Sequence, residues 1–163
     1  MKYIICLIIL LGLFFTGCDK DSSPSNTTPE QQVHVYPLAV GNRWIYSGGD
    51  TILIDGTATL NGKTAHHILG DDDYTLGERN LYYEGNMLYG WDGADTVASP
   101  LFDEITLQTL TVENVTVPAG TFETYKYSWG TATTKIYWFR KGGGVVKANL
   151  NGDIRELIAY TLH

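Results

Sequence analysis

Residues 109–129, TLTVENVTVPAGTFETYKYSW, decide the fold that this sequence predicts. Residues 111–117 are rich in β-branched side chains, which fit a pleated and half-buried surface. Pro118 cannot donate a hydrogen bond to a ladder and so belongs at a strand end, while Gly120 can adopt the positive φ of a tight corner. The stretch therefore predicts two antiparallel strands joined at a corner, and we expect this hairpin to be central in its sheet.

An aromatic row follows the corner. Tyr125, Tyr127 and Trp129 alternate with polar residues and so share one face of the second strand. Residues 135–140, KIYWFR, are apolar on both faces and add Tyr137 and Phe139. Such aromatic side chains most often form a core. The alternative is that these five residues face a bound ligand, and we treat them as the candidate ligand-facing residues.

Short alternating segments separated by turn residues predict an all-β fold. The further predicted strands are 43–47, 51–60, 63–69, 80–84, 87–91, 145–150 and 153–162, with loops at 70–79 and 90–101 and an extended segment at 105–110. Asn61-Gly62 is a strong hairpin signal, because both residues tolerate positive φ. A single short helix within 102–110 is the alternative there. Because several strands are apolar on both faces, we expect an antiparallel sheet curled into a half-open or nearly closed barrel.

The first 17 residues have the features of a secretory signal peptide, namely Lys2, an apolar run over 3–15 and then small residues. The run is too short to cross a bilayer, which takes about 20 residues. The sequence FTGC at 15–18 resembles the lipobox of bacterial lipoproteins, and this resemblance implies cleavage before Cys18 and acyl chains on its thiol. An ordinary signal peptide or an anchor helix is the alternative.

Residues 18–32 are expected to form the lipidated cysteine and a disordered tether, because 19–32 are rich in Ser, Thr, Pro and charge. At full stretch such a tether reaches about 45–50 Å. Residues 33–163 have the length of a single domain. The chain has 2 cysteines, of which one would leave with the signal peptide and the other would be acylated, so no intrachain disulfide is expected.

The formal net charge of −7 argues against binding to nucleic acid and against docking on anionic head groups by charge alone. The expected partners are instead the membrane, through acyl chains on Cys18, and an apolar ligand or an envelope protein. We expect the domain to lie in the bacterial cell envelope, outside the cytoplasm. Asp19 follows the lipidated residue, and it does not decide between the inner membrane and the cell surface.

Three motifs resemble a group of uncharacterised bacterial envelope lipoproteins of the DUF3108-like kind. They are YPL with GN and W at 36–44, VTVPAGTF at 115–122, and YWF followed by KG and GVV at 137–146. The resemblance implies a distant similarity in fold to the periplasmic lipoprotein carriers, whose half-open barrels hold acyl chains. It implies no catalytic residues, and it does not extend to residues 70–100.

No residue pattern predicts catalysis, a cofactor or a metal site. Asp71-Asp72-Asp73 could offer oxygen ligands to Ca²⁺, but adjacent carboxylates in extended chain point in different directions. His66 and His67 would lie on opposite faces of a strand, and no serine sits in a nucleophile elbow. We therefore expect a protein without enzymatic activity.

Three functions are compatible with the sequence. The first is a domain that binds an acyl chain or another apolar ligand, suggested by the apolar faces. The second is an assembly or interaction subunit that docks a partner protein. The third is a carbohydrate-binding module, because Tyr and Trp faces stack on sugars. The state of the barrel interior, open or filled, separates the first from the second.

Overall fold

The computed structural model describes residues 33–75, 79–91, 98–129 and 135–163, and Gln32–His163 is one compact unit. The described residues form one antiparallel sheet of 11 strands, a short α-helix and a 3-10 turn. The strands are β1 (Arg43–Tyr46), β2 (Thr51–Leu60), β3 (Lys63–Leu69), β4 (Asn80–Glu84), β5 (Met87–Trp91), β6 (Ser99–Asp103), β7 (Val112–Val117), β8 (Gly120–Trp129), β9 (Lys135–Arg140), β10 (Gly144–Leu150) and β11 (Asp153–Thr161). The helix α1 spans Glu104–Gln108, and the 3-10 turn η1 spans Asp72–Thr75.

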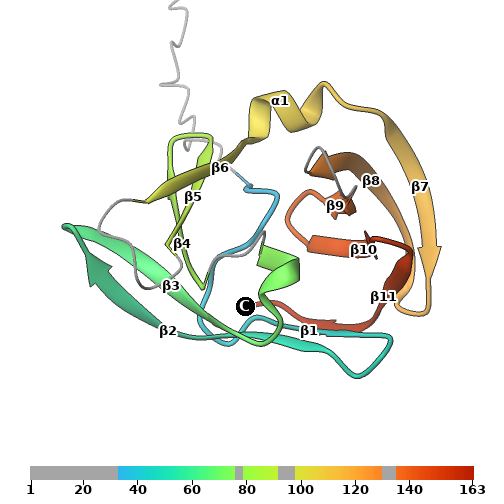
Figure 1. Cartoon of the computed structure of the whole chain (residues 1–163), viewed down its shortest axis with the longest axis horizontal. Coiled ribbons are helices and arrows are strands. Elements are labelled where there is room, and N and C mark those ends of the chain that lie inside the picture. The colour runs from blue at the N-terminus through green and yellow to red at the C-terminus, as the bar shows by residue number, and fades with distance from the viewer. Residues whose placement is uncertain (1–32, 76–78, 92–97, 130–134) are drawn as a thin grey trace, which may run out of the picture. The chain divides into compact units, whose positions relative to one another are not determined.

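The predicted fold class is confirmed. The strand order is β6-β5-β4-β3-β2-β1-β11-β10-β9-β8-β7, and each neighbouring pair is antiparallel. Figure 1 shows the sheet curling round on itself, with α1 between strands β6 and β7. Because β6 and β7 do not pair with each other, the barrel is half-open.

The hairpin β7–β8 forms at the predicted place, and its register runs without a shift from Val112 opposite Tyr125 to Val117 opposite Gly120. Its predicted central position is wrong, because β7 is an edge of the sheet. The reason lies in the chain ends. The first strand, β1, pairs with the last, β11, in the middle of the sheet, so the middle of the chain supplies both edges.

The region before β7 differs from the main prediction. A loop was expected over 90–101 and an extended segment over 105–110, whereas the structure has strand β6 and helix α1. The helix begins where the Asp103 carboxylate accepts the backbone N–H of Ile105 at 3.0 Å, which is a standard N-cap. Leu107 is buried on the inner side of the helix. The alternative of one short helix within 102–110 is therefore the correct one.

Large buried side chains occupy the inside of the curled sheet. The cluster mixes aromatic and aliphatic residues from strands on both sides of the β1–β11 junction. Twelve large side chains have less than 2% relative exposure, and they are Trp44, Tyr36, Tyr46, Tyr74, Tyr137, Phe139, Ile52, Ile54, Leu81, Leu88, Leu107 and Leu157. Burial of a large apolar side chain contributes about 1.5–3 kcal/mol, so this cluster is the main source of stability.

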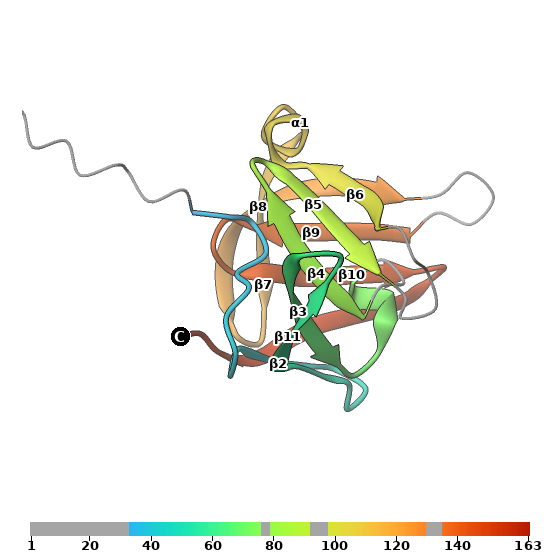
Figure 2. The same cartoon turned by 90° about the vertical axis from the view of Figure 1, so that its left-hand side faces the viewer.

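The segment that precedes β1, residues 33–42, runs along the strands (Figure 2), and at its end Gly41 and Asn42 exchange backbone hydrogen bonds with Ile54 of β2. Val35 and Tyr36 are buried in the core. The carbonyl of His34 accepts the N–H of Gly142 at 2.9 Å, and the carbonyl of Val35 accepts the N–H of Gly144 at 3.0 Å. This leading segment is thus part of the folded domain, although it has no regular secondary structure.

Candidate functional site

The five candidate ligand-facing aromatics differ in how deeply the structure buries them. Tyr137 and Phe139 are fully buried in the core of the sheet. Tyr125, Tyr127 and Trp129 are half-buried, and they pack against the same core. The five therefore do share one side of β8 and β9, and the prediction that this side faces a ligand stays a prediction.

Another aromatic ring reaches this row from the far edge of the sheet. Phe102 of β6 lies 5.3 Å from Phe139 and 6.1 Å from Tyr127, measured between ring centroids. Tyr137 and Phe139 are 5.9 Å apart. These tilted arrangements are the ones that aromatic pairs prefer in protein cores. The inner side of β8 and β9 thus lies beside one ring of β6, a strand whose first three residues belong to the predicted loop 90–101.

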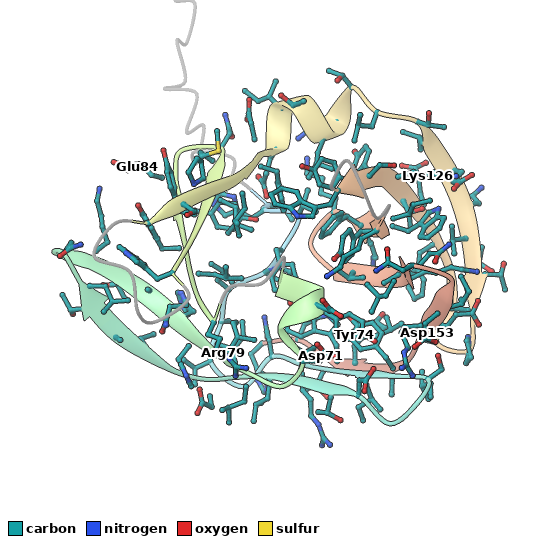
Figure 3. The ribbon with its side chains drawn as sticks, viewed as in Figure 1. Asp71, Tyr74, Arg79, Glu84, Lys126 and Asp153 are labelled. Atoms are coloured by element: carbon teal, nitrogen blue, oxygen red, sulfur yellow. The ribbon has the colours of Figure 1, made fainter. Side chains whose placement is uncertain are left out.

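The turn η1 adds a further ring to the interior. Tyr74 stacks on Tyr46 with a centroid distance of 4.1 Å, and its hydroxyl donates to Asp50 at 2.9 Å. Burial, together with the neighbouring Asp50 carboxylate, raises the pKa of the Tyr74 phenol. Arg155 lies on the other side of Asp50, with its Nε 3.5 Å from the carboxylate. Figure 3 shows Tyr74 projecting toward the inside of the curl.

Asp71 and Asp73, of the acidic sequence at 71–73, make contacts with other residues of the domain. The Asp71 carboxylate accepts the backbone N–H of Asp73 at 2.9 Å, which forms an Asx-type turn. Asp73 pairs with Lys135, and its carbonyl accepts the Tyr137 hydroxyl at 2.7 Å. These contacts tie η1 to β9. Among the residues that the structure describes, no group of three or more His, Cys, Asp and Glu residues is arranged to hold a metal ion.

The two neighbouring histidines of β3 have different surroundings. His67 Nδ1 lies 2.6 Å from an oxygen of Asp55 on the neighbouring strand. Burial lowers the pKa of His66, so its imidazole is favoured in the neutral form. Asp92 and Asp95, in the predicted loop 90–101, lie outside the described residues.

A buried carboxylate that sequence analysis missed joins α1 to the leading segment. Glu104 has a side-chain exposure of 3%; its Oε1 accepts the N–H of Val35 at 2.5 Å, and its Oε2 lies 3.0 Å from Nδ1 of His34. The His34 ring stacks on Tyr83 at 3.7 Å, and the Tyr83 hydroxyl accepts the N–H of Tyr36 at 3.2 Å. Burial and the Glu104 carboxylate raise the pKa of Tyr83. We call these five residues the Glu104 clamp.

Charged side chains surround Trp138 on the outer side of β9. Trp138 is 9% exposed, and Lys126 and Lys147 lie over its ring at 5.3 and 5.8 Å from the centroid. The indole N–H donates to Glu113, and Lys147 pairs with Glu156 at 2.8 Å. Lys126 is labelled in Figure 3 beside β7. The side chains therefore form a ladder across β7 to β11 in which each lysine has an acidic neighbour, as expected for a structural feature.

Apolar side chains are also exposed on the outside of the domain. The large exposed ones are Val33, Val40, Leu69, Ile105, Val112, Ile154, Ile158 and Tyr160, with exposures between 38% and 57%. They are spread over several elements, including both β7 and β11. Within the described ranges no helix has the length and apolarity needed to span a bilayer.

Comparisons with known proteins add little to this geometry. No protein-family model and no curated protein matches the chain. Among solved structures, a "putative lipoprotein" from Parabacteroides distasonis is 13% identical, with 79% of this chain and 99% of that chain covered and a TM-score of 0.41. A "putative exported protein with YmcC-like fold" from Bacteroides fragilis is 12% identical, with 80% and 100% covered and a TM-score of 0.40. Similarity at this level supports no conclusion about function. Cys18, the signal peptide and the tether lie outside the described residues.

Proposed function

We propose that this chain is a lipid-anchored protein of the bacterial envelope whose β domain recognises a partner protein with its outer surface. The anchor is the acylated Cys18, and the tether over 19–32 lets the domain reach a partner away from the membrane. No enzymatic step is part of this proposal. The domain contributes an acidic surface that is held at the membrane.

The observation that supports this proposal is the cluster of buried large side chains inside the curled sheet. An acyl chain inside the curl would have to displace side chains such as Tyr74, Tyr137 and Phe139, all with less than 2% exposure. Removal of a buried aromatic ring from its packing costs about 3–5 kcal/mol, whereas each buried methylene of a ligand contributes only about 0.8 kcal/mol. Recognition by the outer surface requires no such rearrangement.

Binding of an apolar ligand is the second candidate, because Tyr125, Tyr127 and Trp129 are only half-buried beside the core. It predicts that the purified domain retains lipid, detectable by mass spectrometry, or enhances the fluorescence of a hydrophobic dye. A domain that does both would displace our first proposal. A glycan array tests the carbohydrate alternative in the same way.

Two measurements on intact producing cells test the first proposal. Growth with labelled palmitate should label the wild-type chain and leave Cys18→Ser unlabelled. Photo-crosslinking amino acids placed singly at exposed positions should trap a specific protein in the lipidated form, and the trapped amount should fall in Cys18→Ser because the domain is no longer held at the membrane. A labelled chain that gives no adduct from any exposed position would leave the anchor standing and refute the docking role.

A further inference from the structure

The edge strand β7 presents backbone groups that no neighbouring strand uses. Thr111 accepts a hydrogen bond from the N–H of Lys126 at 3.1 Å, so the residues that bond to β8 are 111, 113, 115 and 117. The N–H and C=O groups of Val112, Asn114 and Thr116 therefore point away from β8. Within the described part of the chain these backbone groups have no hydrogen-bond partner from another element. Figure 1 shows β7 at the periphery of the domain, with no described element beyond it.

The two edges of the sheet differ in how well they are protected. The opposite edge, β6, contains Pro100, its register with β5 is interrupted by a shift, and Leu101 and Phe102 are buried. Proline and irregular register are common ways in which proteins prevent pairing at an edge. In β7 there is no proline, no lysine and no register shift, and Val112 is 48% exposed. An edge of this kind is competent to accept another strand.

The chemistry of this edge specifies what binds there. The outward donors and acceptors of the alternate residues Val112, Asn114 and Thr116 are matched by an extended backbone, which places its own groups at the same spacing. On one face the new strand would lie beside Val115 and Val117, and on the other beside Asn114 and Thr116. A second copy of this chain is disfavoured, because each copy has a net charge of −7.

On this basis we propose that the partner docks by adding an extended segment as a further strand at the free edge of β7. The segment has apolar and polar residues in alternation and a positive charge that complements the acidic domain. This inference rests on the proposed docking function and names the mode of that docking.

The test uses the full lipidated chain in intact cells of its host. A benzoylphenylalanine crosslinker at Thr116 probes the edge of β7, and the same crosslinker at Ile154, which is 43% exposed on β11, is the matched control. Asn114→Pro then removes one outward N–H, while Asn114→Ala removes the side chain and keeps that N–H. We expect a strong adduct from Thr116, an unchanged adduct in Asn114→Ala, and a loss of about tenfold in Asn114→Pro.

Hydrogen exchange gives a second measurement that does not depend on the folding of the proline variant. In the isolated chain the amides of Val112, Asn114 and Thr116 should exchange fast. In the purified complex with the crosslink-identified protein these three amides should become protected, whereas the amide of Val115 should be protected in both. Protection confined to the complex supports strand addition.

The negative results distinguish a failure of strand addition from a failure of the docking function. Adducts from Ile154 or other exposed positions but none from Thr116 would overturn strand addition and leave the docking function standing. No adduct from any position would refute both. An adduct made only with a second copy of this chain, or one equally strong in a folded Asn114→Pro variant, would also overturn the inference.

Discussion

Truncation of the buried carboxylate in the Glu104 clamp, Glu104→Ala, should strongly destabilise the domain. The carboxylate is 3% exposed, and the Val35 residue whose N–H it accepts is fully buried. A buried N–H left without an acceptor costs about 1–3 kcal/mol, and a hydrogen bond to a charged group contributes about 1.5–3 kcal/mol. The His34 imidazole has a side-chain exposure of 28%, so solvent screens that contact and it adds less than about 1 kcal/mol. We expect a total loss of about 3 kcal/mol.

Thermal unfolding followed by circular dichroism measures this loss. For a domain of this length 3 kcal/mol corresponds to a fall in Tm of about 10 °C. Glu104→Gln retains an acceptor for the Val35 N–H and should lose about half as much. Glu123→Ala, which removes an exposed carboxylate from β8, is the control and should change stability by less than about 0.5 kcal/mol. A Tm for Glu104→Ala within about 2 °C of the wild type would refute the reasoning, because the N–H of Val35 would then have another partner.

The remaining predictions concern buried tyrosines and one glycine. Burial raises the pKa of seven tyrosines, and in five of them the shift above the ordinary value of about 10 is large. Stability is therefore complete below about pH 10 and falls as pH rises through it, by about 1.4 kcal/mol for each of these five at about pH 11. They are Tyr36, Tyr46, Tyr74, Tyr83 and Tyr137. We expect the tyrosinate absorbance of these five residues to appear together with the loss of circular dichroism in one alkaline transition, and ionisation of every tyrosine in a chain that keeps its circular dichroism would contradict this. Tyr74→Phe removes only the hydrogen bond to Asp50 and should cost about 1 kcal/mol, whereas Tyr74→Ala also removes a buried ring and should cost about 3–5 kcal/mol. Urea unfolding measures both, and equal costs would show that the ring is not packed. Gly70→Ala would place a Cβ 2.1 Å from the Thr51 carbonyl oxygen and should cost more than about 2 kcal/mol, while Gly62→Ala meets no atom within 4 Å and should cost about 1 kcal/mol, with both measured by the same titration.

Local chemistry made the hairpins predictable. Asn61 and Asn151 have positive φ values of 49° and 60°, and each is followed by a glycine with positive φ. Asparagine and glycine adopt this conformation at low cost, so the two turns could be located without knowledge of the rest of the fold. The β7–β8 hairpin was predictable for the same reason, since proline and glycine mark its corner.

Long-range contacts were not predictable. The N-terminal strand pairs with the C-terminal strand, and this pairing alone decides which hairpin becomes an edge. Glu104 at the start of a helix is ordinarily a solvated residue that favours the helix dipole. Its burial depends on Val35, which is 69 positions earlier in the chain. Tyr74 in an acidic loop is a similar case, because its acceptor, Asp50, is on another element.

The two-sided apolarity of β9 now has a physical explanation that bears on function. Tyr137 and Phe139 face the core, where the Asp73 carbonyl of η1 accepts the Tyr137 hydroxyl and the Phe102 ring of β6 lies 5.3 Å from Phe139. Trp138 faces the opposite way, and there the ammonium groups of Lys126 and Lys147 lie over its ring and beside the carboxylates of Glu113 and Glu156. Both faces of the strand are therefore satisfied within the domain, and its apolar sequence does not by itself require a ligand. Among the described residues, no strand pairs with the outer edge of β7, and for that reason we favour recognition through this edge over storage of an apolar molecule inside the sheet.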